Sequence, residues 1–183
     1  MKLTKTLLTS TLLATSIFSF QSTAWADTPE QQFQQGLESV NKGDYQTAIK
    51  LWKPLAEQGS ASAQFNLGLM YSKGYGVKQD YTEAAKWNRK AAEQGNIDAQ
   101  NAMGEVYLSG IGVKQNDAEA VKWYRKAAEQ GSATAQHAMG LFYSGTFSVD
   151  VIKEDLSKAK EWFRKACDNG SQYACDDLRK LEK

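Results

Sequence analysis

Small and apolar residues recur along the chain with the spacing of amphipathic helices. Between Ala63 and Tyr71, alanine, leucine, methionine and tyrosine fall at positions i, i+4, i+7 and i+8, which lie on one face of a helix. Between Ala84 and Ala92, alanine and tryptophan fall at i, i+3, i+7 and i+8. Gly95 then follows, as expected of a residue just beyond a helix end. The pattern predicts a pair of helices packed through one face each.

This pair is repeated. The second helix AKWNRKAAEQG (85–95) returns as VKWYRKAAEQG (121–131) and KEWFRKACDNG (160–170), at intervals of 36 and 39 residues. The first helix AQFNLGLMYSKGYGVKQD (63–80) returns as AQNAMGEVYLSGIGVKQN (99–116) and AQHAMGLFYSG (135–145). The longer interval adds residues only after Gly145, between two helices. A period of this length predicts a stack of helix pairs.

Glycine and tryptophan recur in register within the repeat. The positions are Gly68, Gly104 and Gly140 on the first helices, and Trp87, Trp123 and Trp162 on the second helices. Because a glycine in mid-helix costs about 1 kcal/mol relative to alanine, its recurrence indicates a close approach of another helix. We expect the indole rings to oppose these glycines and fill the space between helices. A ligand-binding box of aromatic rings is the alternative, but helical spacing with repetition favours a core.

The motifs A-Q-x-x-L/M-G-x-x-Y, G-x-G-V-K-Q-D/N, A-x-x-W and R-K-A-A-E-Q-G resemble Sel1-like repeats, which are relatives of tetratricopeptide repeats. The resemblance covers nearly all of Gly43 to Cys175. It implies an all-α fold, a right-handed α-solenoid of antiparallel helix pairs whose first helices line a concave surface. It also implies an adaptor or scaffold rather than an enzyme. The segment from Glu30 to Gly59 resembles an ordinary tetratricopeptide unit, in which Pro54 should kink or shorten the second helix.

The chain divides into four parts on this basis. Residues 1–26 are expected to be a signal peptide and residues 27–59 an N-terminal capping unit of the tetratricopeptide type. Residues 60–170 form the Sel1-like repeats, and residues 171–183 a C-terminal capping helix.

The first 26 residues have the order of a bacterial secretory signal. Lys2 and Lys5 precede an apolar stretch from Leu7 to Phe20, and Ala24-Trp25-Ala26 matches a signal peptidase site. We expect cleavage after Ala26 and export to the periplasm or the medium. A buried N-terminal helix is the alternative. The apolar run is too short for a good transmembrane helix, so no membrane insertion is expected after cleavage.

Charge gives no reason to expect a nucleic acid partner. Loss of Lys2 and Lys5 would leave 20 basic against 21 acidic residues, a net charge of about −1. We expect a monomer that binds a protein or peptide and needs no cofactor.

Cys167 and Cys175 are the only cysteines, on either side of the turn Asp168-Asn169-Gly170. Antiparallel helices joined by such a turn can bring the two side chains within bonding distance, and an exported chain favours a disulfide. The spacing is also similar to that of secreted cysteine-rich Sel1 proteins, in which such pairs brace the repeats. A redox-active pair is the alternative, but there is no Cys-x-x-Cys motif. The bridge should secure the C-terminal cap.

Residues suited to catalysis are scarce. His137 is the sole histidine and lacks an evident nucleophile, and no cysteine or histidine cluster has zinc-ligand spacing. Ser39 to Lys42 and Ser157 to Lys160 fit Ser-x-x-Lys, but neither is followed by Ser-Asp-Asn or Lys-Thr-Gly. No catalytic residue or metal ligand is therefore assigned. A weak cell-wall-related enzyme, penicillin-binding or β-lactamase-like, is the alternative function suggested by family analogy.

Aligning the repeats on their glycines identifies first-helix positions that should face the concave groove by resemblance to tetratricopeptide repeats. They are Phe33, Leu37, Phe65, Leu69, Asp98, Asn101, Glu105, His137 and Leu141. Their chemistry changes between repeats while the packing positions recur, which favours a binding surface over drift on an exposed face. The pattern predicts a peptide or protein segment with an apolar anchor near Phe33 and Phe65, and a basic group near Asp98 and Glu105.

Overall fold

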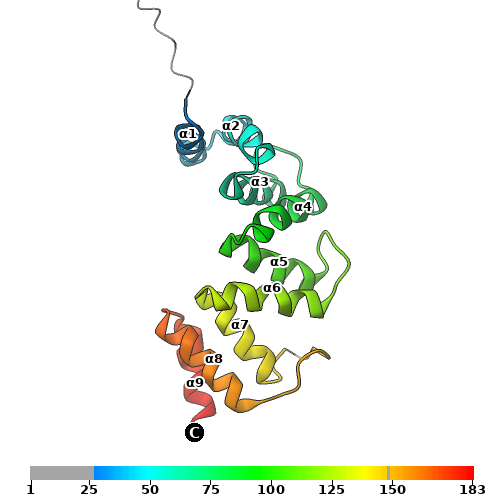
Figure 1. The fold of residues 1–183 in the computed structure, drawn as a ribbon, viewed down its shortest axis with the longest axis vertical. Helices are drawn as coiled ribbons and strands as arrows, with labels where there is room; N and C mark the ends of the chain where they lie inside the picture. The colour runs from blue at the N-terminus through cyan, green and yellow to red at the C-terminus, as the bar shows by residue number, and fades with distance from the viewer. Residues whose placement is uncertain (1–26, 148) are drawn as a thin grey trace, which may run out of the picture.

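A computed structural model describes residues 27–147 and 149–183, which form a stack of helices (Figure 1). Over these residues there are helices and no strands. The helices are α1 (Pro29–Asn41), α2 (Tyr45–Glu57), α3 (Ala61–Lys73), α4 (Tyr81–Glu93), α5 (Ile97–Ser109), α6 (Asp117–Glu129), α7 (Ala133–Tyr143), α8 (Leu156–Asp168) and α9 (Gln172–Leu181). Each packs mainly on its neighbours in the chain, so the predicted all-α solenoid is confirmed. The predicted signal peptide and its cleavage site lie outside the described residues.

Polar caps start every described helix. The residue before each helix accepts a hydrogen bond from a backbone N–H of the first turn, which satisfies a donor that the helix leaves unpaired. At the ends of α3 and α5, Gly74 and Gly110 adopt the left-handed conformation with φ of 71°. These local signals fix where the elements begin and end. Pro54 does not shorten α2, whose 13 residues equal those of α4 and α6.

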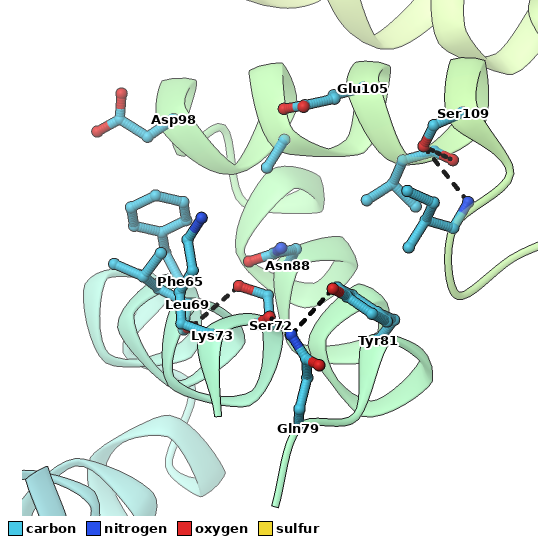
Figure 2. A pocket seen from close by; sticks show the side chains of 13 residues that line it. Phe65, Leu69, Ser72, Lys73, Gln79, Tyr81, Asn88, Asp98, Glu105 and Ser109 are labelled. Carbon is cyan, nitrogen blue, oxygen red and sulfur yellow. Dashed lines mark hydrogen bonds between the residues drawn. The ribbon is translucent and has the colours of Figure 1, made fainter. Parts of the chain in front are cut away.

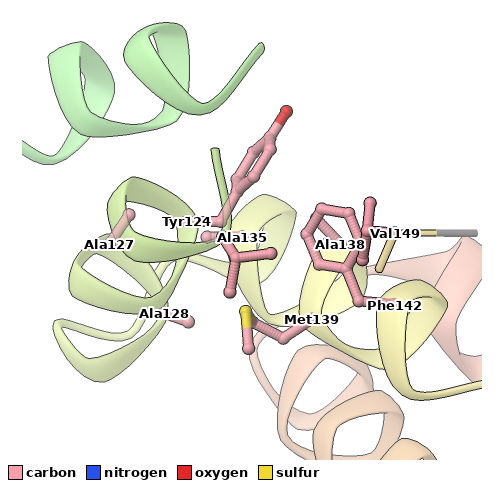
Figure 3. Close-up of a cluster of buried hydrophobic side chains, with 9 residues drawn as sticks. Tyr124, Ala127, Ala128, Ala135, Ala138, Met139, Phe142 and Val149 are labelled. Atoms are coloured by element: carbon pink, nitrogen blue, oxygen red, sulfur yellow. The ribbon is translucent and has the colours of Figure 1, made fainter. Parts of the chain in front are cut away.

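The core consists of consecutive apolar clusters between helices. Ala63, Leu67 and Met70 of α3 are buried as predicted. Figure 3 shows the cluster in which Tyr124 of α6 lies near Met139 of α7. Burial is spread along the stack in successive clusters, each drawing on neighbouring helices, as expected for a repeat fold.

The mid-helix glycines mark close approaches, but the predicted glycine–tryptophan pairing is wrong. A Cβ atom on Gly104 would lie 2.7 Å from the Tyr124 ring, and one on Gly140 would lie 2.4 Å from the Phe163 ring. Tyr124 and Phe163 each follow a tryptophan. Successive helical residues differ by about 100° in direction, so Trp123 points instead into the cluster of α4 and α5.

A row of buried glutamines joins one repeat to the next. Gln100 donates from Nε2 to the Ala92 carbonyl at 3.1 Å, and its Oε1 accepts from Gln130 Nε2 at 2.7 Å. Gln64 and Gln136 make the equivalent pairs of bonds. Because each glutamine is 4% exposed, its polar atoms are satisfied inside the stack. This arrangement holds the helix pairs in register.

Candidate functional site

A pocket of about 530 Å³ lies between the first helices of two adjacent repeats, α3 and α5 (Figure 2). Phe65 and Leu69 contribute from α3, Asp98 and Glu105 from α5, and Asn88 from α4. Four of the nine predicted groove residues therefore meet in one place. Asn88 also lines the pocket and was not predicted.

The apolar and acidic sides follow from helical spacing. Phe65 and Leu69 stand four residues apart on α3, and Asp98 and Glu105 stand seven apart on α5, so each pair shares a helix face. Leu69 is 36% exposed, which is a high value for a leucine beside a core. The pocket thus has an apolar side from one repeat and an acidic side from the next.

The negative charge of Glu105, on the acidic side of the pocket, acts on Tyr124 of α6. Burial, and then the negative charge of Glu105, raise the pKa of Tyr124 to about 12. Lys73 of α3 also lines the pocket, so two carboxylates and one ammonium group line it.

Side chains near the start of α4 close one end of the pocket. Gln79 Nε2 donates to the Ser72 carbonyl at 2.8 Å and to the Tyr81 hydroxyl at 2.9 Å (Figure 2). These bonds tie the loop after α3 to the first turn of α4. The pocket is therefore bounded by packed helices and a braced loop.

Asn88 occupies a position where the other repeats carry an aromatic ring. Its side chain packs on Gly68, and a Cβ atom there would lie 2.1 Å from Asn88 Oδ1. Asn88 is 6% exposed, and its Oδ1 has no hydrogen-bond partner. The sequence signal for this residue was present, since the aligned residue is Trp52, Tyr124 or Phe163 in the other units.

Phe33 and Leu37 lie at the N-terminal end, away from this pocket. Phe33 lines a smaller hollow of about 270 Å³ between α1 and α3, with Leu55 and Ser62. Leu37 packs against the cluster that contains Trp52. The predicted apolar anchor at Phe33 is thus separate from the one at Phe65.

The remaining predicted groove residues make contacts within the chain. Asn101 exchanges hydrogen bonds with the Ser132 hydroxyl, at 2.9 and 3.1 Å. His137 Nε2 lies 2.8 Å from Asp177 of α9. Leu141 packs on the cluster that contains Phe163. The structure does not bring these three residues to the pocket.

The cysteine pair lies where it was expected. The Cα atoms of Cys167 and Cys175 are 4.8 Å apart and the sulfur atoms are at disulfide-bonding distance. The pair joins the end of α8 to α9.

Neither Ser-x-x-Lys motif lies at the pocket. The Ser39 hydroxyl donates to the Gln35 carbonyl of its own helix at 2.8 Å, and Ser157 lies in the exposed first turn of α8. Within residues 27–147 and 149–183, no group of three or more histidine, cysteine, aspartate or glutamate side chains could hold a metal ion. The helices of this part of the chain are all too short or too polar to cross a membrane.

Solved structures share this architecture. A protective antigen present in uropathogenic Escherichia coli strains, displaying an SLR fold, is 37% identical, with a TM-score of 0.77 over 82% of this chain and 32% of that chain. A Sel1 repeat protein from Oxalobacter formigenes is 35% identical, with a TM-score of 0.74 over 80% of this chain and 59% of that chain. The present chain thus spans less than two thirds of either relative.

A third structure shows the fold alone. Helicobacter pylori cysteine rich protein B is 24% identical, with a TM-score of 0.50 over 58% of this chain and 91% of that chain. No curated protein matches the chain.

The Sel1 repeat model matches four consecutive segments. They are residues 33–60, 61–96, 97–132 and 133–171. Proteins built from these repeats are generally scaffolds for protein–protein interaction. Because the four segments run without a gap through most of the chain, the protein belongs to the Sel1 repeat family.

Proposed function

We propose that this protein is an exported adaptor that binds a protein or peptide through the groove formed by its first helices. The observation that carries the proposal is the pocket between α3 and α5. It unites Phe65 and Leu69 with Asp98 and Glu105. An apolar side facing an acidic one suits a segment with both apolar and basic side chains.

Export is supported by the cysteine pair and by the order of residues 1–26. Disulfides persist in oxidising compartments and are rare in the bacterial cytosol. Cys167 and Cys175 lie at bonding distance, and a signal-like segment precedes the repeats. We propose the periplasm or the medium as the place of action.

An affinity pulldown from bacterial envelope extract tests the adaptor role. The wild type is compared with a groove variant, Phe65→Ser with Glu105→Gln, and with a matched control, Tyr173→Ser with Glu129→Gln. The control also removes one aromatic ring and one carboxylate, from exposed positions outside the pocket. The proposal expects a partner that the wild type and the control retain and the groove variant loses. A partner retained equally by all three proteins would contradict it.

A further inference from the structure

We propose that Asn88 makes the pocket between α3 and α5 a recognition site for the backbone of an extended peptide that carries a lysine or arginine side chain. The inference rests on the proposed adaptor function and adds the chemistry of the partner. Three features support it: the position of Asn88 differs between repeats, its Oδ1 is buried without a partner, and the pocket is negatively charged.

Asn88 occupies a position that carries an aromatic ring in the other repeats. In every repeat, one side chain of the second helix lies on the glycine of the first helix. The pairs are Gly36 with Trp52, Gly68 with Asn88, Gly104 with Tyr124, and Gly140 with Phe163. Three of these side chains are aromatic rings, each at most 9% exposed. Asparagine is far smaller than these rings; its side chain still covers Gly68, and it also lines the pocket between α3 and α5.

The Asn88 carboxamide is the polar group at this position. Oδ1 is buried and unpartnered, although buried polar groups in folded proteins almost always have a hydrogen-bond partner. An unpaired polar group at this position destabilises the repeat relative to the ring that its neighbours carry. Oδ1 lies against Gly68, but the carboxamide lines the pocket (Figure 2), so a rotation about χ2 would turn Oδ1 toward a ligand that supplies the missing partner and removes this loss.

The Asn88 carboxamide suits a peptide group as its ligand. A carboxamide presents one carbonyl acceptor and an NH₂ donor side by side. A peptide group offers the complementary donor and acceptor, so an asparagine side chain can pair with the backbone of an extended segment whatever its sequence. An extended segment leaves its peptide groups free for such a pair, whereas those of a helix are already bonded within the helix.

The charged residues of the pocket favour a basic side chain in the ligand. Asp98 and Glu105 place two carboxylates along one side, and Lys73 supplies one positive charge. The net negative charge attracts a basic side chain and disfavours an acidic one. Phe65 and Leu69 on the other side would contact the methylene groups of a lysine or arginine or an adjacent apolar residue. The preferred segment therefore combines one basic and one apolar residue around a free peptide group.

Selection from a phage-displayed library of random dodecapeptides tests the inference on protein purified from cells that express the full chain. The affinities of enriched peptides are measured by fluorescence anisotropy for the wild type and three variants. Asn88→Tyr restores the ring that Tyr124 shows to be compatible with the repeat. Asp98→Asn with Glu105→Gln removes the charge, and Lys122→Ala, on an exposed face of α6, is the control. Circular dichroism verifies that each variant is folded.

The inference expects enriched peptides to contain lysine or arginine, and to bind Asn88→Tyr at least tenfold more weakly than wild type. The charge variant should lose at least fivefold, and Lys122→Ala should bind as the wild type does. N-methylation of one backbone amide in an enriched peptide should weaken binding at a single position of the peptide.

Other outcomes separate the two proposals. Peptides that the charge variant loses but Asn88→Tyr keeps would overturn the role of Asn88 and leave the groove intact. Peptides without basic residues, or an N-methyl scan without effect at any position, would overturn the partner chemistry. A library that yields no binding peptide would overturn both the inference and peptide binding by the groove.

Discussion

The side chain of Asn88 packs on the bare backbone of Gly68, the contact that an aromatic ring makes with glycine in each of the other repeats. The same position thus holds an aromatic ring in three repeats and a polar side chain in one, and the polar side chain lines a pocket. Stability and binding should respond in opposite directions when this residue is changed.

We expect Asn88→Tyr to raise the free energy of unfolding by about 1–2 kcal/mol. The substitution removes a buried unpaired oxygen and adds apolar area above Gly68. Urea denaturation measures the change. The reverse substitution, Tyr124→Asn, is the comparison and should lower the same quantity by about 3 kcal/mol. A less stable Asn88→Tyr protein would mean that the repeat is built around the asparagine.

Glycine should be required where a ring lies on the first helix. A Cβ atom at Gly140 would meet Phe163 at 2.4 Å, so Gly140→Ala should cost about 1–3 kcal/mol despite the better helix propensity of alanine. Gly68→Ala should cost less, because the Asn88 side chain can rotate away into the pocket. Thermal unfolding followed by circular dichroism compares the two. Equal losses would contradict the difference in packing.

The fold could be predicted because its signals are local and recur. The apolar face of α3 and its polar cap recur at equivalent positions in α5 and α7. Periodicity alone therefore identified the helix pairs. Phe65 and Leu69, and likewise Asp98 and Glu105, were predicted to line a groove by resemblance to tetratricopeptide repeats, and the spacing within each pair places its two residues on one helix face. The pocket brings these two pairs together.

Other parts of the site depend on the rotation of one helix against another, which spacing within a helix does not determine. The recurring tryptophans were therefore paired with the glycines, although the next residue makes the contact, and Asn88 was missed. His137 is aligned with Phe65 in the repeat, but its contacts depend on α9. Within the described residues this short helix lies beside the last repeat alone, and its Asp177 lies 2.8 Å from His137 Nε2.

The glutamine row should contribute to stability in each repeat. Gln100→Leu would remove one of the bonds to the Ala92 carbonyl, which also accepts from the Gly95 N–H, and would leave the Gln130 amide without its Gln100 acceptor. We expect a loss of about 1–3 kcal/mol in the free energy of unfolding, measured in urea. Gln34→Leu, on the exposed side of α1, is the control and should change stability by less than about 0.5 kcal/mol. Similar values for both would show that the row is dispensable.

Cys167 and Cys175 occupy the positions that Ala128 and Gln136 hold one repeat earlier, so the covalent pair replaces a hydrogen bond of 3.0 Å. Replacing both cysteines by serine should cost about 2–3 kcal/mol, as estimated for closing a short loop. Cys167→Ala with Cys175→Gln should cost less, because it introduces the residues that form the Gln136–Ala128 hydrogen bond one repeat earlier. Denaturation with and without a reducing agent measures both effects. A wild type that is unaffected by reduction would contradict a stabilising bridge.

Acid should loosen the C-terminal cap through Asp177. Burial acts to raise its pKa, but the hydrogen bonds from Lys180 and His137, with their charges, outweigh burial and lower the pKa below its usual value. The unfolded chain therefore binds the proton more readily. This contribution is complete above the unfolded pKa of about 4 and is lost as the pH falls through the folded pKa.

We expect Asp177→Asn to weaken the fall in melting temperature between pH 5 and pH 3, measured by scanning calorimetry. Asp150→Asn, in the exposed loop after α7, should keep the acid dependence of the wild type. An unchanged profile in Asp177→Asn would place the acid sensitivity elsewhere.

The most direct test of the adaptor function is site-specific photo-crosslinking in living bacteria. A benzophenone amino acid is placed at Leu69 inside the pocket or at Lys86 on the exposed face of α4. The account predicts a covalent adduct with a partner protein from position 69 and none from position 86. An adduct from position 86 alone, or no adduct from position 69, would contradict binding through the groove.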